Sequence, residues 1–225
     1  RGVNYIKDSF QLLKIGVPTA GQMLLEGAAF VVTSVMMGWF GAEAIAANQV
    51  AMTYGNAAFM LTVALGSAAT IRTSHCYGLR DNVQIRSVII SSIHLAVLWG
   101  AFVLILFIVF RNILPMAFTP SREIIALAAP MMVLVALYQV SDAIQGTLVG
   151  VLRGVQDVKI IAYLSFVAYV LLNIPVGYLC GFVLNMGPAA MFIGYIFGLG
   201  TAAVLYLLRI RFKLKSFRKD LSVFK

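Results

Sequence analysis

Charged side chains are scarce in this chain of 225 residues: Asp, Glu, Lys and Arg make up 11% of it, whereas hydrophobic residues make up 61%. The apolar residues form runs of about 20 or more, longer than the helices of a soluble core need and long enough to cross a bilayer. Strands of a membrane barrel would be about 9 to 11 residues long and would alternate in character. The composition therefore predicts an all-α integral membrane protein and excludes a β-barrel.

Cysteine and histidine are also rare, which argues against a metal centre of the zinc type. Cys76 and Cys180 have no metal-type spacing, so both are predicted to be free thiols. His75 lies beside Cys76 but lacks the two further ligands that zinc needs. His94, near the start of an apolar run, is predicted to be a packing or interfacial residue rather than a proton relay.

The formal charge of +9 does not indicate a nucleic-acid partner, because the basic residues lie in the short segments between the apolar runs and in the tail. If the amino terminus is cytosolic, the inner segments hold fifteen Lys and Arg residues and the outer loops hold only Arg111 and Arg122. Cytosolic loops of membrane proteins are enriched in such residues. We therefore expect a multi-pass protein of the cell membrane, the inner membrane in a Gram-negative cell, with both termini cytosolic and the loops near Glu43, Asn112 and Asn185 external.

Six apolar runs are predicted to span the membrane, within a region of residues 15–211, at about residues 15–40, 44–70, 88–110, 124–152, 160–184 and 188–208. The third run is the most uniformly apolar and is expected to face lipid or pack, without carrying chemistry. Residues 1–14 are predicted to form a cytosolic interfacial linker, and residues 212–225 a basic cytosolic tail. The chain opens on Arg1 with no signal-peptide pattern, so we expect it to be part of a longer protein.

One carboxylate lies inside the otherwise apolar fourth run. Asp142 follows Tyr138 by four residues and precedes Gln145 by three, so on a helix the three side chains form one polar stripe. An aspartate in hydrocarbon costs roughly 2.5 to 3.5 kcal/mol, so this stripe is expected to face a water-filled cavity or a partner helix. Beyond it a glycine recurs every four residues, which predicts a face that a neighbouring helix approaches closely: Gly146, Gly150 and Gly154.

Glu26 is the second deep carboxylate, and counting along the helices places it level with Asp142. Glu26 lies twelve residues inward from Lys14, and Asp142 lies eleven inward from Arg153. At about 1.5 Å per residue, both are roughly 17 Å from the cytosolic end, near the middle of a hydrocarbon core about 30 Å thick. No basic residue is predicted at that depth, so each acid must be protonated, bind a cation or be hydrated. Two such acids in one cavity would share a proton or exchange it for a monovalent cation.

A structural role is the alternative for both acids, in which each is protonated and hydrogen-bonded to Gln22 or Tyr138. We favour a functional role because acids inside a membrane usually mark an ion or substrate path. Helical facing predicts that Gln22, Gln49 and Asn173 line the same cavity.

Three stretches resemble the multidrug and toxic compound extrusion (MATE) family, in particular its NorM-like branch. They are PTAGQMLLEGAAF, which holds Glu26; the segment from Ala46 to Asp81; and YQVSDAIQGTLVGVLRGVQD, which holds Tyr138 and Asp142. The resemblance covers nearly the whole chain. It implies the second of the two six-helix lobes of a twelve-helix transporter that is not an enzyme, and it implies that the missing N-terminal lobe comes from the same parent chain or from a partner.

The resemblance also implies a function, the export of drugs, organic cations and other amphipathic compounds by alternating access, driven by sodium or proton entry. On that basis Glu26 and Asp142 would be the coupling carboxylates, able to hold a monovalent cation such as sodium, and Tyr138 would line the same site. No cofactor is implied beyond the coupling ion.

Other functions are distinguished by features of the two acids and of the cavity. A lipid-linked oligosaccharide flippase of the same superfamily would have a more cationic cavity, and no arginine is predicted at midplane depth here. An intramembrane aspartyl protease would need Tyr-Asp and Gly-x-Gly-Asp motifs, and neither occurs around Glu26 or Asp142. A non-transporting structural half is a further alternative, which a gene for the missing lobe immediately upstream would argue against.

Overall fold

The computed structural model describes the backbone of residues 5–222, and the side chains of residues 9–214 apart from those at positions 11 and 82. Within that range the structure is helical and has no strand. Six segments are long and apolar enough to cross a membrane, which confirms the predicted all-α membrane fold. They are α1 (Tyr5–Met37), α2 (Ala42–Gly78), α3 (Asn82–Val109), α4 (Arg122–Gly154), a fifth span made of α5 (Val158–Ser165), η3 (Phe166–Asn173), α6 (Ile174–Tyr178) and η4 (Leu179–Val183), and α7 (Ile193–Ser222) preceded by η5 (Pro188–Phe192). Two short turns, η1 (Gly38–Phe40) and η2 (Leu114–Ala117), lie in the connections at one end of the bundle.

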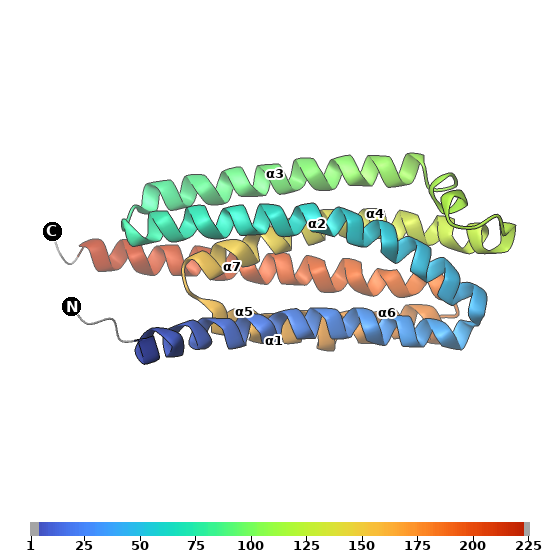
Figure 1. The fold of residues 1–225 in the computed structure, drawn as a ribbon, viewed down its shortest axis with the longest axis horizontal. Coiled ribbons are helices and arrows are strands. Elements are labelled where there is room, and N and C mark those ends of the chain that lie inside the picture. Colours follow the sequence, from blue (N-terminus) through green and yellow to red (C-terminus); the bar gives the residue numbers. More distant parts are fainter. Residues whose placement is uncertain (1–4, 223–225) are drawn as a thin grey trace.

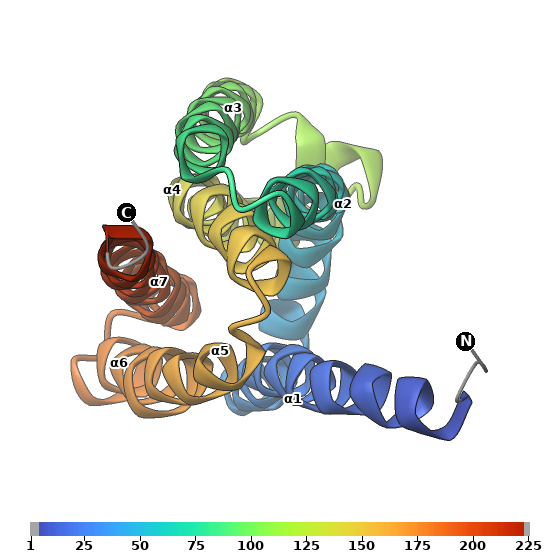
Figure 2. The ribbon, with the colours of Figure 1, turned by 90° about the vertical axis from the view of Figure 1, so that its left-hand side faces the viewer.

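The helices lie side by side along the long axis, and both chain ends leave the bundle at the same end (Figure 1). Helix α4 is central, because it packs against α2, α3 and α7 and is buried over most of its carboxyl-terminal half. Seen from the end that holds the termini, α3 stands at one edge of the lobe, and α1 with the α5–α6 span forms the opposite side (Figure 2). The central position of α4 brings the predicted polar stripe into the interior of the lobe.

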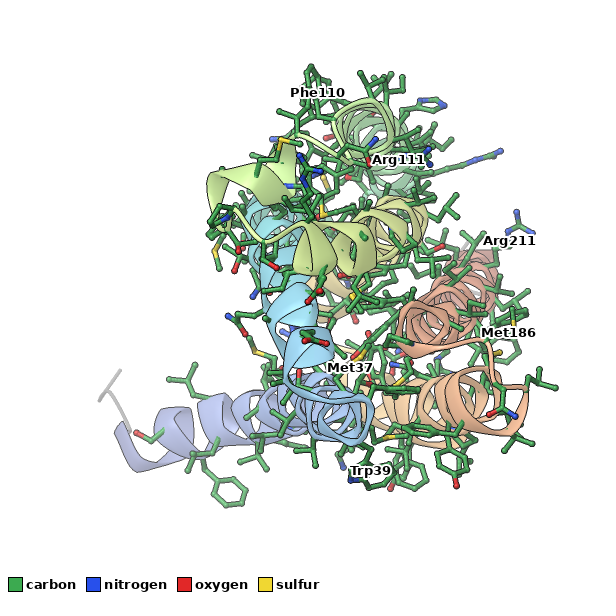
Figure 3. All side chains as sticks on the ribbon, turned by 90° about the vertical axis from the view of Figure 1, so that its right-hand side faces the viewer. Met37, Trp39, Phe110, Arg111, Met186 and Arg211 are labelled. Atoms are coloured by element: carbon green, nitrogen blue, oxygen red, sulfur yellow. The ribbon has the colours of Figure 1, made fainter. Side chains whose placement is uncertain are left out.

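Apolar side chains cover the outside of the bundle, as expected for a surface that faces lipid. Trp39, Phe110 and Met186 project from the end opposite the termini (Figure 3), and their exposed fractions lie between 40% and 64%. At the end that holds the termini, Arg209 donates to Asp157 at 2.8 Å and 3.3 Å, and the Lys213 ammonium lies 3.8 Å from the same carboxylate. This ion-pair cluster joins the loop between α4 and α5 to α7.

The glycine face of α4 packs against α2, which confirms the predicted close helix approach. A Cβ atom at Gly150 would overlap the backbone carbonyl of Gly66, and one at Gly146 would come within 2.7 Å of the Thr62 side chain. Thr70 donates a hydrogen bond across the same crossing to the Gly150 carbonyl at 3.0 Å. Such backbone contact is possible only where side chains are absent, since inserting a methyl group into a packed interface typically costs about 1–3 kcal/mol.

The fifth span is not a regular α-helix, because π-helical segments precede and follow α6. Pro175 has no amide proton for the preceding turn, and the wider turns of η3 end two residues before it, at Asn173. A Cβ atom at Gly194 of α7 would overlap the Asn173 carbonyl, so this pair of helices is also in backbone contact. The fifth span therefore departs from regular α-helix through π-helical segments beside a close helix contact.

Several helices extend beyond the predicted spans. Helix α1 starts at Tyr5 and continues through the region predicted as a separate linker, α2 runs on to Gly78, and α7 continues to Ser222 in the predicted basic tail. Hydropathy marks only the part of a helix that lies in hydrocarbon, whereas backbone hydrogen bonds continue a helix into the interface. Residues 1–4 of the linker and residues 223–225 of the tail lie outside the described residues.

Candidate functional site

A pocket of about 180 Å³ opens between α1, α2 and α4, at the middle of their length. Its wall is mostly aromatic, apolar or glycine, and two carboxyl groups enter it. The residues that line it are Met23, Glu26, Gly27, Phe30, Gly55, Asn56, Phe59, Tyr138, Gln139 and Asp142. The structure therefore brings the two predicted acids and Tyr138 into one pocket, as the count of residues along the helices led us to expect.

A single amide group joins the two carboxyl groups. The Gln145 side-chain nitrogen donates to Glu26 Oε1 at 3.3 Å and to Asp142 Oδ1, also at 3.3 Å. All three side chains are buried, and Gln145 and Asp142 belong to the same face of α4. The acids on α1 and α4 thus share one donor, and a change at either acid acts directly on the other.

A second amide links Glu26 to a positive charge, which corrects the expectation that no basic residue serves these acids. Gln22, one turn before Glu26 on α1, donates to Glu26 Oε2 at 2.7 Å. The Arg153 guanidinium in turn donates to Gln22 Oε1 at 2.7 Å and interacts electrostatically with Glu26. Counting Cα positions placed Arg153 near the cytosolic end, but its side chain is long enough to reach toward the middle of the membrane.

Buried oxygen atoms without a hydrogen-bond partner lie beside the bridging amide. Among the described residues, Asp142 Oδ2 and Gln145 Oε1 have no such partner. The side chain of Tyr169, in η3, is buried nearby and interacts electrostatically with both acids. Buried polar atoms are nearly always satisfied, so these acceptors call for a proton, a water molecule or a cation as partner. Carboxylate and amide oxygens are suitable ligands for a hard cation, and a proton on Asp142 would equally satisfy one of them.

Tyr138 forms the aromatic side of the pocket. Its ring lies nearly parallel to that of Phe192, with centroids 6.4 Å apart, and is tilted against Tyr195 at 5.4 Å. A Cβ atom at Gly55 would lie 2.9 Å from the Tyr138 hydroxyl, so the glycine on α2 makes room for it. Phe30 of α1 stacks on Tyr195 at 4.7 Å and continues the aromatic wall. Aromatic faces of this kind can bind organic cations.

None of the three predicted cavity residues lines this pocket. Gln49 is exposed on α2, and Asn173 is buried where η3 crosses α7, with its amide nitrogen unpartnered among the described residues. Gln22 lies behind the pocket, hydrogen-bonded to Glu26. Helical facing alone misplaced Gln49 and Asn173, because the rotation of each helix about its axis depends on the neighbours against which it packs.

The remaining candidates contribute nothing to the pocket. His94 is exposed on α3, Cys76 is buried and Cys180 half-buried, and both thiols are free. Within the part of the chain that the structure describes, no group of three or more His, Cys, Asp or Glu side chains could hold a metal ion.

Tyr169 and Arg153 are two residues beside the acids that sequence reasoning missed. Tyr169 precedes Asn173 by four residues, but Asn173 packs against α7 away from the pocket, so helical spacing gave no usable signal for Tyr169. Arg153 was counted as a loop residue that sets the topology. Only its hydrogen bond to Gln22 in the structure reveals that it also brings a positive charge close to Glu26.

Comparisons with known proteins agree with this architecture. The MatE family model matches residues 18–179. The multidrug resistance protein NorM of Photobacterium profundum is 35% identical over 209 residues, which cover 91% of this chain and 46% of NorM. The multidrug resistance protein MdtK of Yersinia pseudotuberculosis is 37% identical over 205 residues, which cover 89% of this chain and 45% of MdtK. The chain thus spans about half the length of the curated relatives it matches.

Solved structures give the same result for the fold. The crystal structure of the eukaryotic MATE transporter AtDTX14 matches with a TM-score of 0.83 at 23% identity, covering 96% of this chain and 50% of that one. An outward-facing multidrug resistance MATE transporter of the MOP superfamily matches with a TM-score of 0.85 at 17% identity, and the match covers 92% of this chain and 47% of that one. Taken together with the family match over residues 18–179, these likenesses show that the chain belongs to the MATE family of membrane transporters.

Proposed function

We propose that this chain is the second lobe of an exporter of amphipathic or cationic small molecules, which uses entry of sodium or protons to drive export. The relatives that match are named as multidrug resistance proteins, which supports drug export over the flippase alternative. The pocket supports it as well, because it combines two acids with an aromatic wall. In this mechanism the lobe rocks against its missing partner and exposes the pocket to each side of the membrane in turn.

The observation that carries the proposal is the amide bridge between Glu26 and Asp142. The two carboxyl groups share one donor, and acceptor oxygens beside them are unpartnered. A coupling cation and a cationic substrate would therefore compete for one set of negative charges. Competition of this kind is reciprocal, so each ligand weakens the binding of the other by the same factor.

The pocket needs a second wall, since it is lined only by α1, α2 and α4 of this lobe. Polar groups that face an open cleft cannot be left in contact with lipid. In full-length relatives the other half lies in the same chain, and we expect the same arrangement here. A lobe expressed alone should not export drugs.

We further propose that both termini are cytosolic, because the basic residues gather at the end of the bundle where the termini lie. A cysteine placed at Asn112 should react with an impermeant maleimide in intact cells, whereas one placed at Asp81 should react only after lysis. Both belong in a background in which Cys76 and Cys180 are replaced by alanine. The opposite labelling pattern would invert the topology.

Substrate binding to the purified full-length transporter tests the coupling. Affinity for a cationic dye should fall as sodium rises at constant pH if sodium is the coupling ion. It should rise with pH at constant sodium if the ion is the proton, because fewer protons then compete. Fluorescence anisotropy over a grid of pH and sodium concentrations measures both effects independently.

The control is a neutral amphipathic substrate, whose affinity should depend less on either ion because no charge competes for the acids. Dye affinity that is the same at every pH and sodium concentration would contradict coupling through this pocket.

A further inference from the structure

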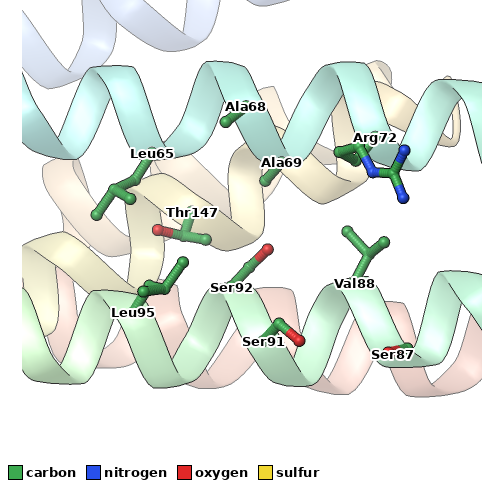
Figure 4. A pocket seen from close by; sticks show the side chains of 10 residues that line it. All are labelled: Leu65, Ala68, Ala69, Arg72, Ser87, Val88, Ser91, Ser92, Leu95 and Thr147. Atoms are coloured by element: carbon green, nitrogen blue, oxygen red, sulfur yellow. The ribbon is translucent and has the colours of Figure 1, made fainter.

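A groove between α2 and α3 forms a second cavity, apart from the pocket at Glu26 and Asp142. It encloses about 300 Å³ and reaches Thr147 of α4 (Figure 4). Helix α3 stands at the edge of the lobe, away from α1, whereas the pocket lies between α1, α2 and α4 (Figure 2). The groove therefore opens on another side of α2, and the proposed transport function makes no use of it.

The groove contains the guanidinium group of Arg72. Arg72 of α2 is exposed and makes no ion pair or hydrogen bond with any residue whose side chain the structure describes. In Figure 4 its side chain extends beside Val88 of α3, along the space between the two helices. Arg72 lies just beyond the predicted span of residues 44–70, where water or an anion can satisfy its guanidinium group.

Three serine hydroxyl groups of α3 lie on the same groove and are also free. Other hydroxyl groups in this lobe donate to the carbonyl four residues earlier, as those of Ser67, Thr70 and Ser74 do. The serines of α3 make no such bond with a described residue, and Figure 4 shows the Ser92 hydroxyl pointing from α3 toward α2. The three are Ser87, Ser91 and Ser92. The groove thus offers one cation and several donors to a ligand.

The polarity of the groove changes with depth in the membrane. Arg72 is six residues from the end of α2 and Ser87 is five from the start of α3, which is about 7–9 Å into each helix. Leu65 and Leu95 are each thirteen residues from the same ends, about 20 Å deep. The polar end lies near the end of the bundle where the termini emerge, and the apolar end lies deeper along the two helices.

We propose that this groove binds an anionic phospholipid of the leaflet next to the termini, with the phosphodiester at Arg72 and one acyl chain toward Leu65 and Leu95. A guanidinium group binds phosphate through paired hydrogen bonds, and serine hydroxyls can donate to the remaining phosphate and glycerol oxygens. Basic pockets between membrane helices on the cytoplasmic side are known to hold anionic head groups. The order of polar and apolar groups along the groove matches the order of head group and chain in a phospholipid.

Native mass spectrometry of the full-length transporter, titrated with phosphatidylglycerol or with phosphatidylcholine of the same chain length, tests the assignment. The wild type should retain one phosphatidylglycerol more tightly than phosphatidylcholine. Arg72→Gln should weaken the binding of that phosphatidylglycerol at least tenfold and leave the binding of phosphatidylcholine unchanged. Arg86→Gln is the matched control, because it removes the same charge near the same end of α3 from an exposed residue that does not line the groove.

Ser92→Leu gives an independent variant, since it fills the groove and keeps Arg72. It too should displace the tightly bound lipid, and it carries the test if Arg72→Gln does not fold. An equal loss of phosphatidylglycerol binding in Arg72→Gln and Arg86→Gln would show diffuse attraction to a basic surface and contradict the proposed site. Displacement of the lipid by millimolar inorganic phosphate would show a free-anion site instead, and equal retention of the two lipids would show that the groove does not select an anion.

Discussion

Asp142→Asn should reduce ion-driven export by the full-length transporter to the level of vesicles without protein. Asparagine keeps the size of the side chain and can still hydrogen-bond to Gln145, but it removes the charge for which coupling ion and substrate compete. A neutral side chain also costs less free energy to place in hydrocarbon than an aspartate does. The variant should therefore insert and unfold thermally like the wild type. Dye efflux from vesicles under a sodium or pH gradient measures the loss.

Tyr138→Phe is the matched control for this experiment. It keeps the ring that packs against Phe192 and Tyr195 and removes only a hydroxyl group, so export should fall only a few-fold. The same binding assay should find that Asp142→Asn no longer responds to the coupling ion. A variant that keeps both active export and ion competition would mean that Asp142 is a structural residue, as the alternative interpretation of the sequence holds.

Arg153→Gln should make the coupling ion bind about tenfold more tightly and slow export. The guanidinium is held at 2.7 Å from Gln22, which donates to Glu26 at 2.7 Å, so a positive charge lies one side chain away from the acid. Removing this charge takes away repulsion against an entering cation, and a tenfold change corresponds to about 1.4 kcal/mol. A tightly held ion is released slowly, and release is part of every cycle. The ion concentration that halves dye binding reports the change.

Arg153→Lys separates the charge from the shape of the side chain, because lysine keeps the charge and can donate to Gln22. It should behave nearly like the wild type. Gln22→Leu breaks the link to Glu26 and leaves Arg153 in place. The effects of Gln22→Leu and Arg153→Gln on the affinity for the coupling ion should not be additive if the two residues act as one unit. If Arg153→Gln folds and shows an unchanged ion dependence, Arg153 serves only the packing and topology of this end of the lobe.

The sequence by itself determined the class of fold and the level of the acids. Six apolar runs of sufficient length appear as six spans, and the two chain ends lie at one end of the bundle. Glu26 and Asp142 were expected at equal depth, and the bridge through Gln145 places them side by side. These features follow from sequence because hydropathy, helix rise and glycine spacing are properties of a single helix. Their role in coupling stays a prediction.

Only the tertiary structure decided which polar side chains accompany the acids. Gln49 and Asn173 face elsewhere, whereas Tyr169 and Arg153 approach the site. The rotation of each helix is set by its packing partners, as at the backbone contact of α4 with α2, and one residue of rotation moves a side chain by about 100°. Side-chain reach adds a second uncertainty, because a long arginine ends far from the depth of its own Cα atom. Both effects depend on neighbours that are remote in sequence, so no local pattern could have revealed them.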